Sequence, residues 1–261
     1  LAVTGTASGI GRALAVELAK RGAHVALSDV DQNGLDETLG LLEGKGKFTR
    51  HVVDVRDRAA VERYAQEVVA EHGGADGIIN NAGVTARASI EEISYEDFEF
   101  VIDVNLWGVV HGVKSLLPLF RKRGAGHIVN ISSINAMVPF ALNGPYNISK
   151  YGVLGLSETL MQELEGTSIR TTCVHPGGIK TNIVRNSRHA SNRDAKMFDR
   201  VARTTAAQAA NVIVNGVERN KERVYVGIDS KLMAAAKRAV PSLMVNLAGA
   251  ATRQPKRKKA G

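Results

Sequence analysis

Two residues near the middle of the chain, Tyr146 and Lys150, have a spacing suited to proton transfer. Residues four apart on a helix share a face, one above the other. A free tyrosine has a pKa of about 10, and a nearby cation lowers that pKa, so that the phenol can exchange a proton with an alcohol or a carbonyl. A half-buried tyrosine one turn before a solvated lysine has the same pattern, and this short motif alone does not distinguish the two.

A short strand is predicted just before this pair, within the stretch 126–152 around which the chain is organised. The apolar, β-branched run at 128–131 follows a Gly-Ala-Gly breaker and ends in two hydroxyls, Ser132 and Ser133. A loop follows, and an apolar-periodic helix then begins near Tyr146. Ser133 is therefore placed to meet Tyr146 and to hold a substrate oxygen.

The N-terminal residues predict a strand, a glycine-rich turn and a helix in succession. The turn contains Gly5, Gly9 and Gly11. Glycines let the backbone approach a phosphate, and a helix N-terminus offers it free N–H groups and a positive dipole end. Asp29 ends the next predicted strand, where a carboxylate can bind the adenosine ribose hydroxyls and repel a 2′-phosphate. This favours NAD over NADP, although an ordinary polar residue can also close a strand.

Strands and helices alternate over the first 83 residues. A helix is predicted at 35–42, a strand at 48–55 with Asp54 near its end, a helix after Asp57, and a strand at 77–79 that leads into the sequence Asn-Asn-Ala-Gly. This order predicts a single-domain α/β fold, a Rossmann-like, doubly wound parallel sheet with helices on both faces. Ligands of such sheets bind at the carboxyl ends of the strands, where the glycine turn, Asp29, Asp54, Asn81 and Ser133 fall.

The second half of the chain adds a long helix and a long loop. The helix starts at Ser94 and carries Asn105 among apolar residues, where it is either a satisfied structural group or a site residue. The strand at 168–174 contains the single cysteine, Cys173, which is interpreted as a core residue. His175 follows, and we favour a structural role for it. A polar loop, expected to act as a lid, then runs to about Arg203.

Composition limits the classes of function. The chain has 261 residues, 44% hydrophobic and 5% aromatic, with a net charge of +8. Residues 253–261 hold five cations and no acid, so the remaining chain carries only +3, and nucleic-acid binding is not expected. No signal peptide and no run of 18 apolar residues is visible, and neither a disulfide nor a metal site is expected. We expect a cytoplasmic protein whose first residues, already in a strand, are preceded by others.

The motifs, in this order, resemble the short-chain dehydrogenase/reductase family over about residues 1–228. The segment 4–11 is similar to its TGxxxGxG cofactor loop, 80–83 to its NNAG motif, and Ser133 with Tyr146 and Lys150 to its Ser…YxxxK centre. The resemblance implies a set of cofactor-binding residues: Gly5, Ser8, Gly9, Ile10, Gly11, Asp29, Asp54, Val55, Asn81, Ala82, Gly83, Tyr146, Lys150, Pro176, Gly177, Ile179 and Thr181.

The resemblance also implies roles for four catalytic residues. Tyr146 takes or supplies the proton of the alcohol, and Lys150 lowers its pKa and binds the nicotinamide ribose. Ser133 stabilises charge on the substrate oxygen. Asn105 holds a water that links Lys150 to solvent. The expected cofactor is NAD rather than NADP, because Ser8 and Val30 stand where NADP-binding members tend to carry a basic residue; Arg12 is only a weak counter-argument.

Three domains or segments are expected: an NAD-binding domain with the catalytic centre (1–228), a helical extension (229–252) and a basic, disordered tail (253–261). The extension departs from the family, so a homodimer through the long helices is expected, and a tetramer is left open. The extension is expected to pack beside the substrate pocket rather than on a membrane surface. The alternatives are an NAD-binding redox sensor without turnover and an epimerase or dehydratase of the same fold.

The substrate is expected to be a hydrophobic secondary alcohol or ketone. This follows from the apolar residues expected to line the pocket, which are Val138, Phe140, Leu142, Ile183 and Met197.

Overall fold

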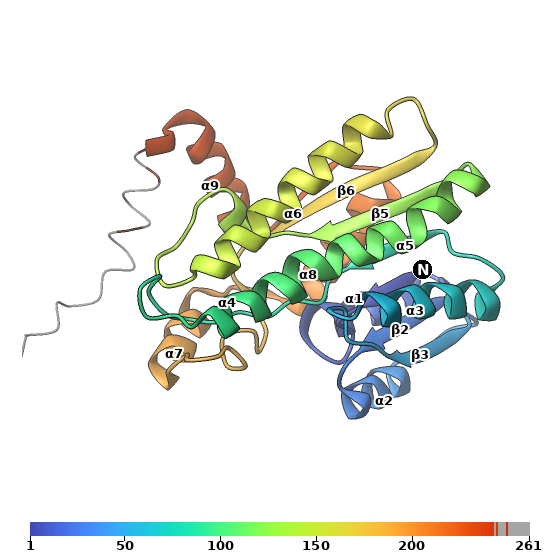
Figure 1. Ribbon diagram of the computed structural model, residues 1–261, viewed down its shortest axis with the longest axis horizontal. Helices are drawn as coiled ribbons and strands as arrows, with labels where there is room; N and C mark the ends of the chain where they lie inside the picture. Colours follow the sequence, from blue (N-terminus) through green and yellow to red (C-terminus); the bar gives the residue numbers. More distant parts are fainter. Residues whose placement is uncertain (243, 245–248, 250–261) are drawn as a thin grey trace, which may run out of the picture.

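A seven-stranded parallel sheet forms the central layer in the computed structural model, which describes residues 1–242, 244 and 249. Its strand order is β3-β2-β1-β4-β5-β6-β9, and helices cover both of its faces (Figure 1). The strands are β1 (Ala2–Thr4), β2 (Val25–Asp29), β3 (Phe48–Val52), β4 (Gly77–Asn80), β5 (Gly126–Ile131), β6 (Ile169–Pro176) and β9 (Arg223–Val226). The order reverses between β1 and β4, which opens a crevice at the carboxyl ends of the strands. The predicted doubly wound, Rossmann-like sheet is confirmed.

The strands bury side chains on both faces, as parallel sheets do. Neighbouring residues alternate between two apolar clusters: Ala2 packs on one face and Val3 on the other. The first cluster includes residues of helices α3 (Arg58–His72), α5 (Gly108–Arg123) and α6 (Gly144–Glu163). The second includes residues of α1 (Gly9–Lys20), α2 (Gln32–Gly40) and α8 (Ala206–Glu218).

One helical stretch is much longer than the others. It joins α4 (Tyr95–Ile102), a π-helical turn η1 (Asp103–Trp107) and α5, for 29 residues in all. By its length and the mean hydropathy of its most apolar 18 residues (1.3), this stretch could cross a membrane, although the sequence holds no unbroken apolar run of that length. Its inner face, with Val113, Leu116 and Phe120, is buried against the sheet, as in the core helix of a globular domain.

The structure corrects two of the predicted elements. Strand β3 ends at Val52, so Asp54 lies in the turn that follows it. The predicted loop up to Arg203 contains a helix, α7 (Asn192–Val201), which begins with a capping box: Ser191 accepts from the backbone of Asp194, whose carboxylate accepts from the Ser191 N–H. The Ser-x-x-Asp spacing of this capping box is a helix start signal that the sequence itself contains.

The segment around α7 is closed by a small sheet of its own. Strand β7 (Ile179–Lys180) pairs in parallel with β8 (Thr204–Thr205), so residues 181–203 leave the main sheet and return to the same place. A short 3-10 turn, η2 (Ile134–Ala136), follows β5, and α9 (Ile228–Ala239) begins the predicted extension. Most of 243–252 and all of the tail at 253–261 lie outside the described residues.

Candidate functional site

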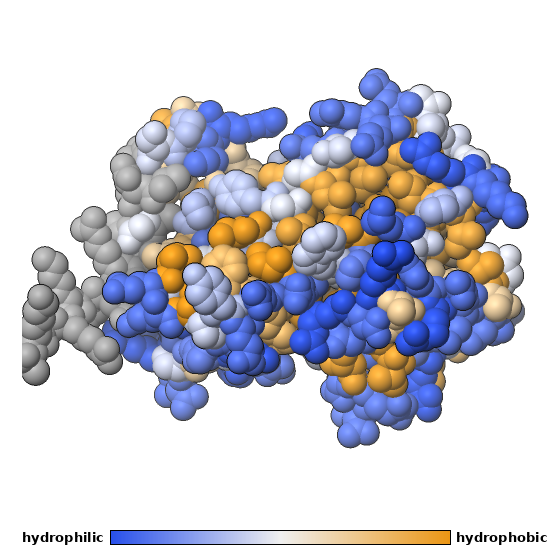
Figure 2. All heavy atoms as spheres, viewed as in Figure 1, coloured by the Kyte–Doolittle hydropathy of each residue, from blue (hydrophilic) through white to orange (hydrophobic). Residues whose placement is uncertain are grey.

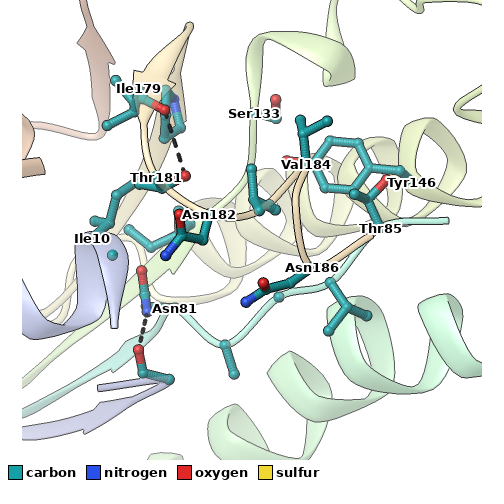
Figure 3. Close-up of a pocket in the computed structure, with 18 of the residues that line it drawn as sticks. Ile10, Asn81, Thr85, Ser133, Tyr146, Ile179, Thr181, Asn182, Val184 and Asn186 are labelled. Atoms are coloured by element: carbon teal, nitrogen blue, oxygen red, sulfur yellow. Dashed lines mark hydrogen bonds between the residues drawn. The ribbon is translucent and has the colours of Figure 1, made fainter. Parts of the chain in front are cut away.

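A cavity of about 820 Å³ lies at the carboxyl ends of the strands. All seventeen predicted cofactor-binding residues line it, as does Ser133; Asn105 does not. Figure 3 shows Ser133 and Tyr146 on one side of the cavity and Ile10 and Asn81 on the other, with Asn182, Val184 and Asn186 between them. The sequence motifs therefore meet in one place, although they come from six different strand ends.

The glycine turn has the shape that a phosphate requires. Gly5 and Gly9 adopt left-handed conformations, with φ of +72° and +55°. A Cβ atom on Gly11 would lie 1.8 Å from the carbonyl oxygen of Gly5, so no side chain fits there. Ser8, the exposed N-cap of α1, makes no side-chain capping bond, which leaves the first N–H groups of the helix open to an anion. These features fit the pyrophosphate of a dinucleotide.

Asp29 braces the glycine turn from the end of β2. Its carboxylate accepts a hydrogen bond of 2.9 Å from the N–H of Ala7 and still lines the cavity. Arg12 does not line the cavity, because its guanidinium bonds to Ala7, Thr38 and Glu37 behind the turn. A 2′-phosphate next to Asp29 would therefore meet a carboxylate without help from Arg12.

Thr4 and Asn81 tie the glycine turn to the end of β4. The hydroxyl oxygen of Thr4 accepts from the N–H groups of Asn81 and Ala82, and the Asn81 amide donates to the carbonyls of Thr4 and Gly5. Thr4 was not predicted as a site residue, although it begins the TGxxxGxG motif.

Tyr146 and Lys150 face one another as their spacing predicts. The ammonium nitrogen of Lys150 lies 5.6 Å from the centre of the Tyr146 ring and donates a 2.9 Å bond to the carbonyl of Ile131. Burial lowers the pKa of Lys150 to about 8. The pKa of Tyr146 is raised by burial, and the Ser133 hydroxyl only partly opposes this effect. In this state, therefore, desolvation outweighs the expected lowering by the lysine, and Tyr146 holds its proton.

A chain of amides orients the hydroxyl of Ser133. The carbonyl of Phe140 can only accept, so Asn147 must donate to it with its NH₂ group (2.8 Å) and present its oxygen to Asn135 (2.8 Å). Asn135 then turns its own oxygen toward the Ser133 hydroxyl, at 3.3 Å, while its backbone N–H donates to the same hydroxyl oxygen, at 3.1 Å. In this state the Ser133 hydroxyl therefore donates to Asn135, and it can rotate to donate its proton to a substrate oxygen or to the Tyr146 phenolate instead.

Sequence reasoning missed both asparagines of this chain. Asn135 lies two residues after Ser133, and Asn147 follows Tyr146 directly. Asn135 lines the cavity. Their positions in the sequence, next to Ser133 and Tyr146, indicate that they could lie in the site. No sequence spacing, however, predicts a contact between a residue in a 3-10 turn and a residue in the next helix.

Ser132 and Asn105 support the site from behind. Ser132 is buried and donates to the backbone carbonyl of Lys150, which leaves Ser133 as the serine beside Tyr146. Asn105 is completely buried in the π-helical turn, accepts from the N–H of Val84 and donates to the Val84 carbonyl and to Ser149. Both polar atoms of the Asn105 side chain thus have hydrogen-bond partners in the protein. Asn105 is connected to the cavity by the backbone of Val84, which follows β4 and lines the cavity.

His175 closes the end of β6 and is completely buried. Its ring stacks on Tyr225, and its Nδ1 lies 3.4 Å from the carbonyl of Ser133. Burial lowers the pKa of His175 to about 4, so the ring is neutral, in line with the structural role that we favoured. The next turn is held by Asp229 of α9, which accepts from the N–H of Gly178 at 2.7 Å.

The substrate side of the cavity differs in part from the prediction. Phe140, Ile183 and Met197 line it, and Met233 places the extension beside the pocket. Val138 is completely buried in the core, and neither it nor Leu142 lines the cavity. The lining also includes polar groups of Thr85, Asn182 and Asn186, and the hydroxyl of Thr85 is buried without a partner among the described residues.

Two charged pairs hold the segment 181–203 over this side. Arg87 bonds to Asp194 at the start of α7, at 2.9 Å. Arg188 pairs with Asp97 of α4 at 2.6 Å and lies over the ring of Phe100. Arg188 and His189 hold the pKa of Asp97 down at about 2.

The chain is similar to known proteins both in sequence and in fold. A family model described as short chain dehydrogenase matches residues 1–192. The putative oxidoreductase SadH of Mycobacterium tuberculosis is 40% identical over 256 residues, which cover 95% of this chain and 93% of that protein. Two solved structures are similar in fold. A short chain dehydrogenase/reductase from Burkholderia phymatum in complex with NAD has a TM-score of 0.85 at 26% identity, covering 98% of this chain and 97% of its own. A serine dehydrogenase complexed with NADP⁺ has a TM-score of 0.79 at 27% identity, covering 87% and 94%.

Proposed function

Because the chain belongs to the short-chain dehydrogenase/reductase family, whose members are oxidoreductases with a nicotinamide cofactor, we propose that it oxidises a secondary alcohol or reduces a ketone with NAD(H). The observation that carries this proposal is the single cavity lined by Ser133, Tyr146 and Lys150 together with the glycine turn. A cleft with a dinucleotide cradle at one end and a tyrosine–lysine pair at the other suits hydride transfer at a carbinol carbon.

A nicotinamide dinucleotide held between the glycine turn and Lys150 would accept the hydride in oxidation and donate it in reduction. Tyr146 carries the proton: it donates to the carbonyl oxygen in reduction and takes the hydroxyl proton in oxidation. Ser133 binds the same substrate oxygen and stabilises the charge that develops on it. Lys150 donates to the carbonyl of Ile131, and its ammonium group lies beside the phenol. When Tyr146 loses its proton, the negative phenolate favours the charged form of Lys150.

The preference for NAD is supported by Asp29. Its carboxylate lies at the end of β2 on the cavity wall, and Val30, which follows it, carries no charge. Similar folds bind either cofactor, as the NAD and NADP⁺ complexes illustrate. The preference therefore rests on this carboxylate, and replacing Asp29 with serine is expected to raise kcat/KM for NADP by roughly tenfold.

The test is NADH formation from a panel of secondary alcohols of graded size, with NAD and NADP compared side by side. We expect turnover with NAD, and we expect Tyr146→Phe to lose activity by at least about a hundredfold while NADH still binds. Undiminished turnover in Tyr146→Phe would exclude the proposed role of the tyrosine. Tight NADH binding without turnover of any alcohol or ketone would favour the redox-sensor alternative.

A homodimer is proposed through the outer face of the long helices. Figure 2 shows apolar side chains gathered over α5 and α6. Among the exposed large side chains, Ile148 and Tyr151 belong to α6 and Trp107 to η1. Light scattering on the purified chain is expected to give twice the mass of 27.9 kDa. The substitution Tyr151→Glu is expected to shift the protein toward the monomer, since a charge in an apolar interface is costly.

A further inference from the structure

The positive charge of the chain is concentrated beside the substrate side of the cavity. Residues 181–203 hold six lysines and arginines and two aspartates, a net charge of +4. The whole chain carries +8, of which residues 253–261 supply +5, so all other residues together carry −1. The mildly basic character of the folded chain thus comes from the segment that covers the substrate side, and such an asymmetry draws anions to one place.

Helix α7 within this segment carries two adjacent rows of side chains. Met197 and Val201, one turn apart, are exposed and also line the cavity. Arg193, Lys196 and Arg200 are spaced three and four residues apart, so they share a face of the helix. All three are exposed, and none lines the cavity. An apolar rim and a row of cations therefore lie side by side on one helix.

These three cations are not needed to hold the segment in place. Arg185 and Arg188 of the same segment are paired, with Asp199 and Asp97. Arg193, Lys196 and Arg200, in contrast, have no ion-pair partner in the part of the chain that the structure describes. Their charges remain available to a ligand at the cavity mouth.

We propose that the substrate is an anionic amphiphile: a secondary alcohol or ketone on an apolar chain whose phosphate or carboxylate group lies outside the cavity, against Arg193, Lys196 and Arg200. This inference rests on the proposed function and leaves its chemistry unchanged, since the carbinol hydrogen leaves as hydride to nicotinamide and the hydroxyl proton leaves through Tyr146. The apolar chain lies along the rim of Met197 and Val201 and against Met233, all of which line the cavity.

The cofactor is also negatively charged, so attraction of the cofactor is an alternative role for these three cations. Steering of the cofactor would act equally on every substrate, whereas recognition of the substrate's anionic group would act only on charged substrates. Both effects weaken with salt, since exposed charges are screened beyond about 8 Å at physiological ionic strength. Paired substrates that differ only in this group separate the two.

The experiment compares two secondary alcohols of equal chain length, one ending in a phosphate monoester and one in a neutral hydroxyl. In the unmodified enzyme at low salt we expect kcat/KM for the phosphate to exceed that for the neutral alcohol by about tenfold. The ratio is expected to approach 1 at 0.5 M NaCl and in the double variant Lys196→Glu/Arg200→Glu. The matched control Lys20→Glu/Arg63→Glu makes the same change of net charge at exposed positions on α1 and α3, and should keep the ratio.

Three results would overturn the inference. Turnover of both alcohols at equal efficiency would reject the anionic group while the proposed function stands. An equal loss for both alcohols in the α7 variant, with a higher KM for NAD, would assign the cations to cofactor steering. Absence of turnover with either alcohol would reject the proposed function and this inference together.

Discussion

The two sides of the cavity are built in different ways. The cofactor side consists of the turns after β1 to β4, and its bonds run largely through the backbone, as from the N–H groups of Gly5 and Thr6 to the carbonyl of Ser28. The substrate side consists of residues 134–143 and 182–205 and depends on side chains that are distant in sequence. Arg87 and Asp194 are 107 positions apart, and Asp97 and Arg188 are 91 apart. The first side is specified mainly by local motifs, which the bonds between Thr4 and Asn81 join across 77 positions, and the second by charged pairs between distant residues.

This difference predicts that the cofactor side tolerates the least change of volume. In Gly11→Ala the new Cβ meets the carbonyl oxygen of Gly5 at 1.8 Å, so the turn must move. We expect NADH affinity to fall by roughly 100-fold, equivalent to about 3 kcal/mol, because the phosphate cradle is made of this backbone. Fluorescence titration with NADH measures the loss.

Gly155→Ala is the matched control. Gly155 is exposed in the middle of α6, and an added Cβ meets no atom within 4 Å. This change is expected to leave NADH binding intact and to stabilise the protein by about 0.5–1 kcal/mol, since alanine is the better helix former. Equal NADH affinity in both variants would mean that the glycine turn does not determine cofactor binding.

The second largest effect is expected at the border between the two sides, where Asn135 orients Ser133. In Asn135→Ala the Ser133 hydroxyl loses the oxygen that holds its proton, and the link to Asn147 is broken. We expect kcat to fall by roughly 30-fold, about 2 kcal/mol, with NADH affinity unchanged. Steady-state kinetics and NADH titration on the same protein separate these effects.

A double-mutant cycle decides whether Asn135 acts through Ser133. If it does, Asn135→Ala should cost much less in a Ser133→Ala background than in the unmodified enzyme, because the hydroxyl that it orients is gone. Additive losses would show that Asn135 supports the loop independently of Ser133.

The same contrast explains how much could be predicted from the sequence. Strand–turn–helix patterns predict the sheet and the glycine turn. They also place Asp29, Asn81, Ser133 and Tyr146 at one edge of the sheet, and the structure brings these residues together there. The predicted lid was harder. The capping box of its helix α7 is local and visible in the sequence, but the placement of α7 depends on Asp97 in α4 and on Arg87 in the loop after β4. Sequence patterns report which residues are near one another along the chain, not which distant charges pair.

The raised pKa of Tyr146 was missed for a related reason. The spacing to Lys150 is local and correctly predicts their proximity, but the balance between attraction and desolvation depends on how deeply both groups are buried. Burial is a property of the whole fold, so the sign of the shift could not be read from the motif.

Between the two sides, His175 is expected to make the protein sensitive to acid. The pKa of His175 is lowered to about 4, against about 6.5 in an unfolded chain, because the ring is buried. As pH falls below about 6.5 the unfolded state gains a proton that the folded state cannot, so stability decreases until about pH 4. The loss at pH 5 is about 2 kcal/mol relative to pH 7.

Urea unfolding at pH 7 and pH 5 measures this loss, and His175→Asn should remove about that much of the pH dependence. His127, whose pKa is also lowered to about 4 by burial, lies at the opposite end of the sheet and provides the comparison. An unchanged pH slope in His175→Asn would mean that the ring is accessible to protons in the folded state.

The smallest effect is expected on the substrate side, where Asp97 anchors the segment that carries α7. In Asp97→Asn the volume is kept, but the charge that attracts Arg188 and His189 is lost. We expect KM for the alcohol to rise about fivefold, about 1 kcal/mol, with NADH affinity unchanged, because only one side of the cavity loosens. The pKa of Asp97, about 2, also predicts that this anchor keeps its charge in the unmodified enzyme throughout pH 5 to 8. The control is Asp76→Asn, which removes the exposed ion pair of Asp76 with Arg123. A surface pair of this kind contributes little energy, so KM for the alcohol should not change in this variant. A loss of NADH affinity in Asp97→Asn would mean that the two sides are coupled and that the long-range pairs also shape the cofactor cradle.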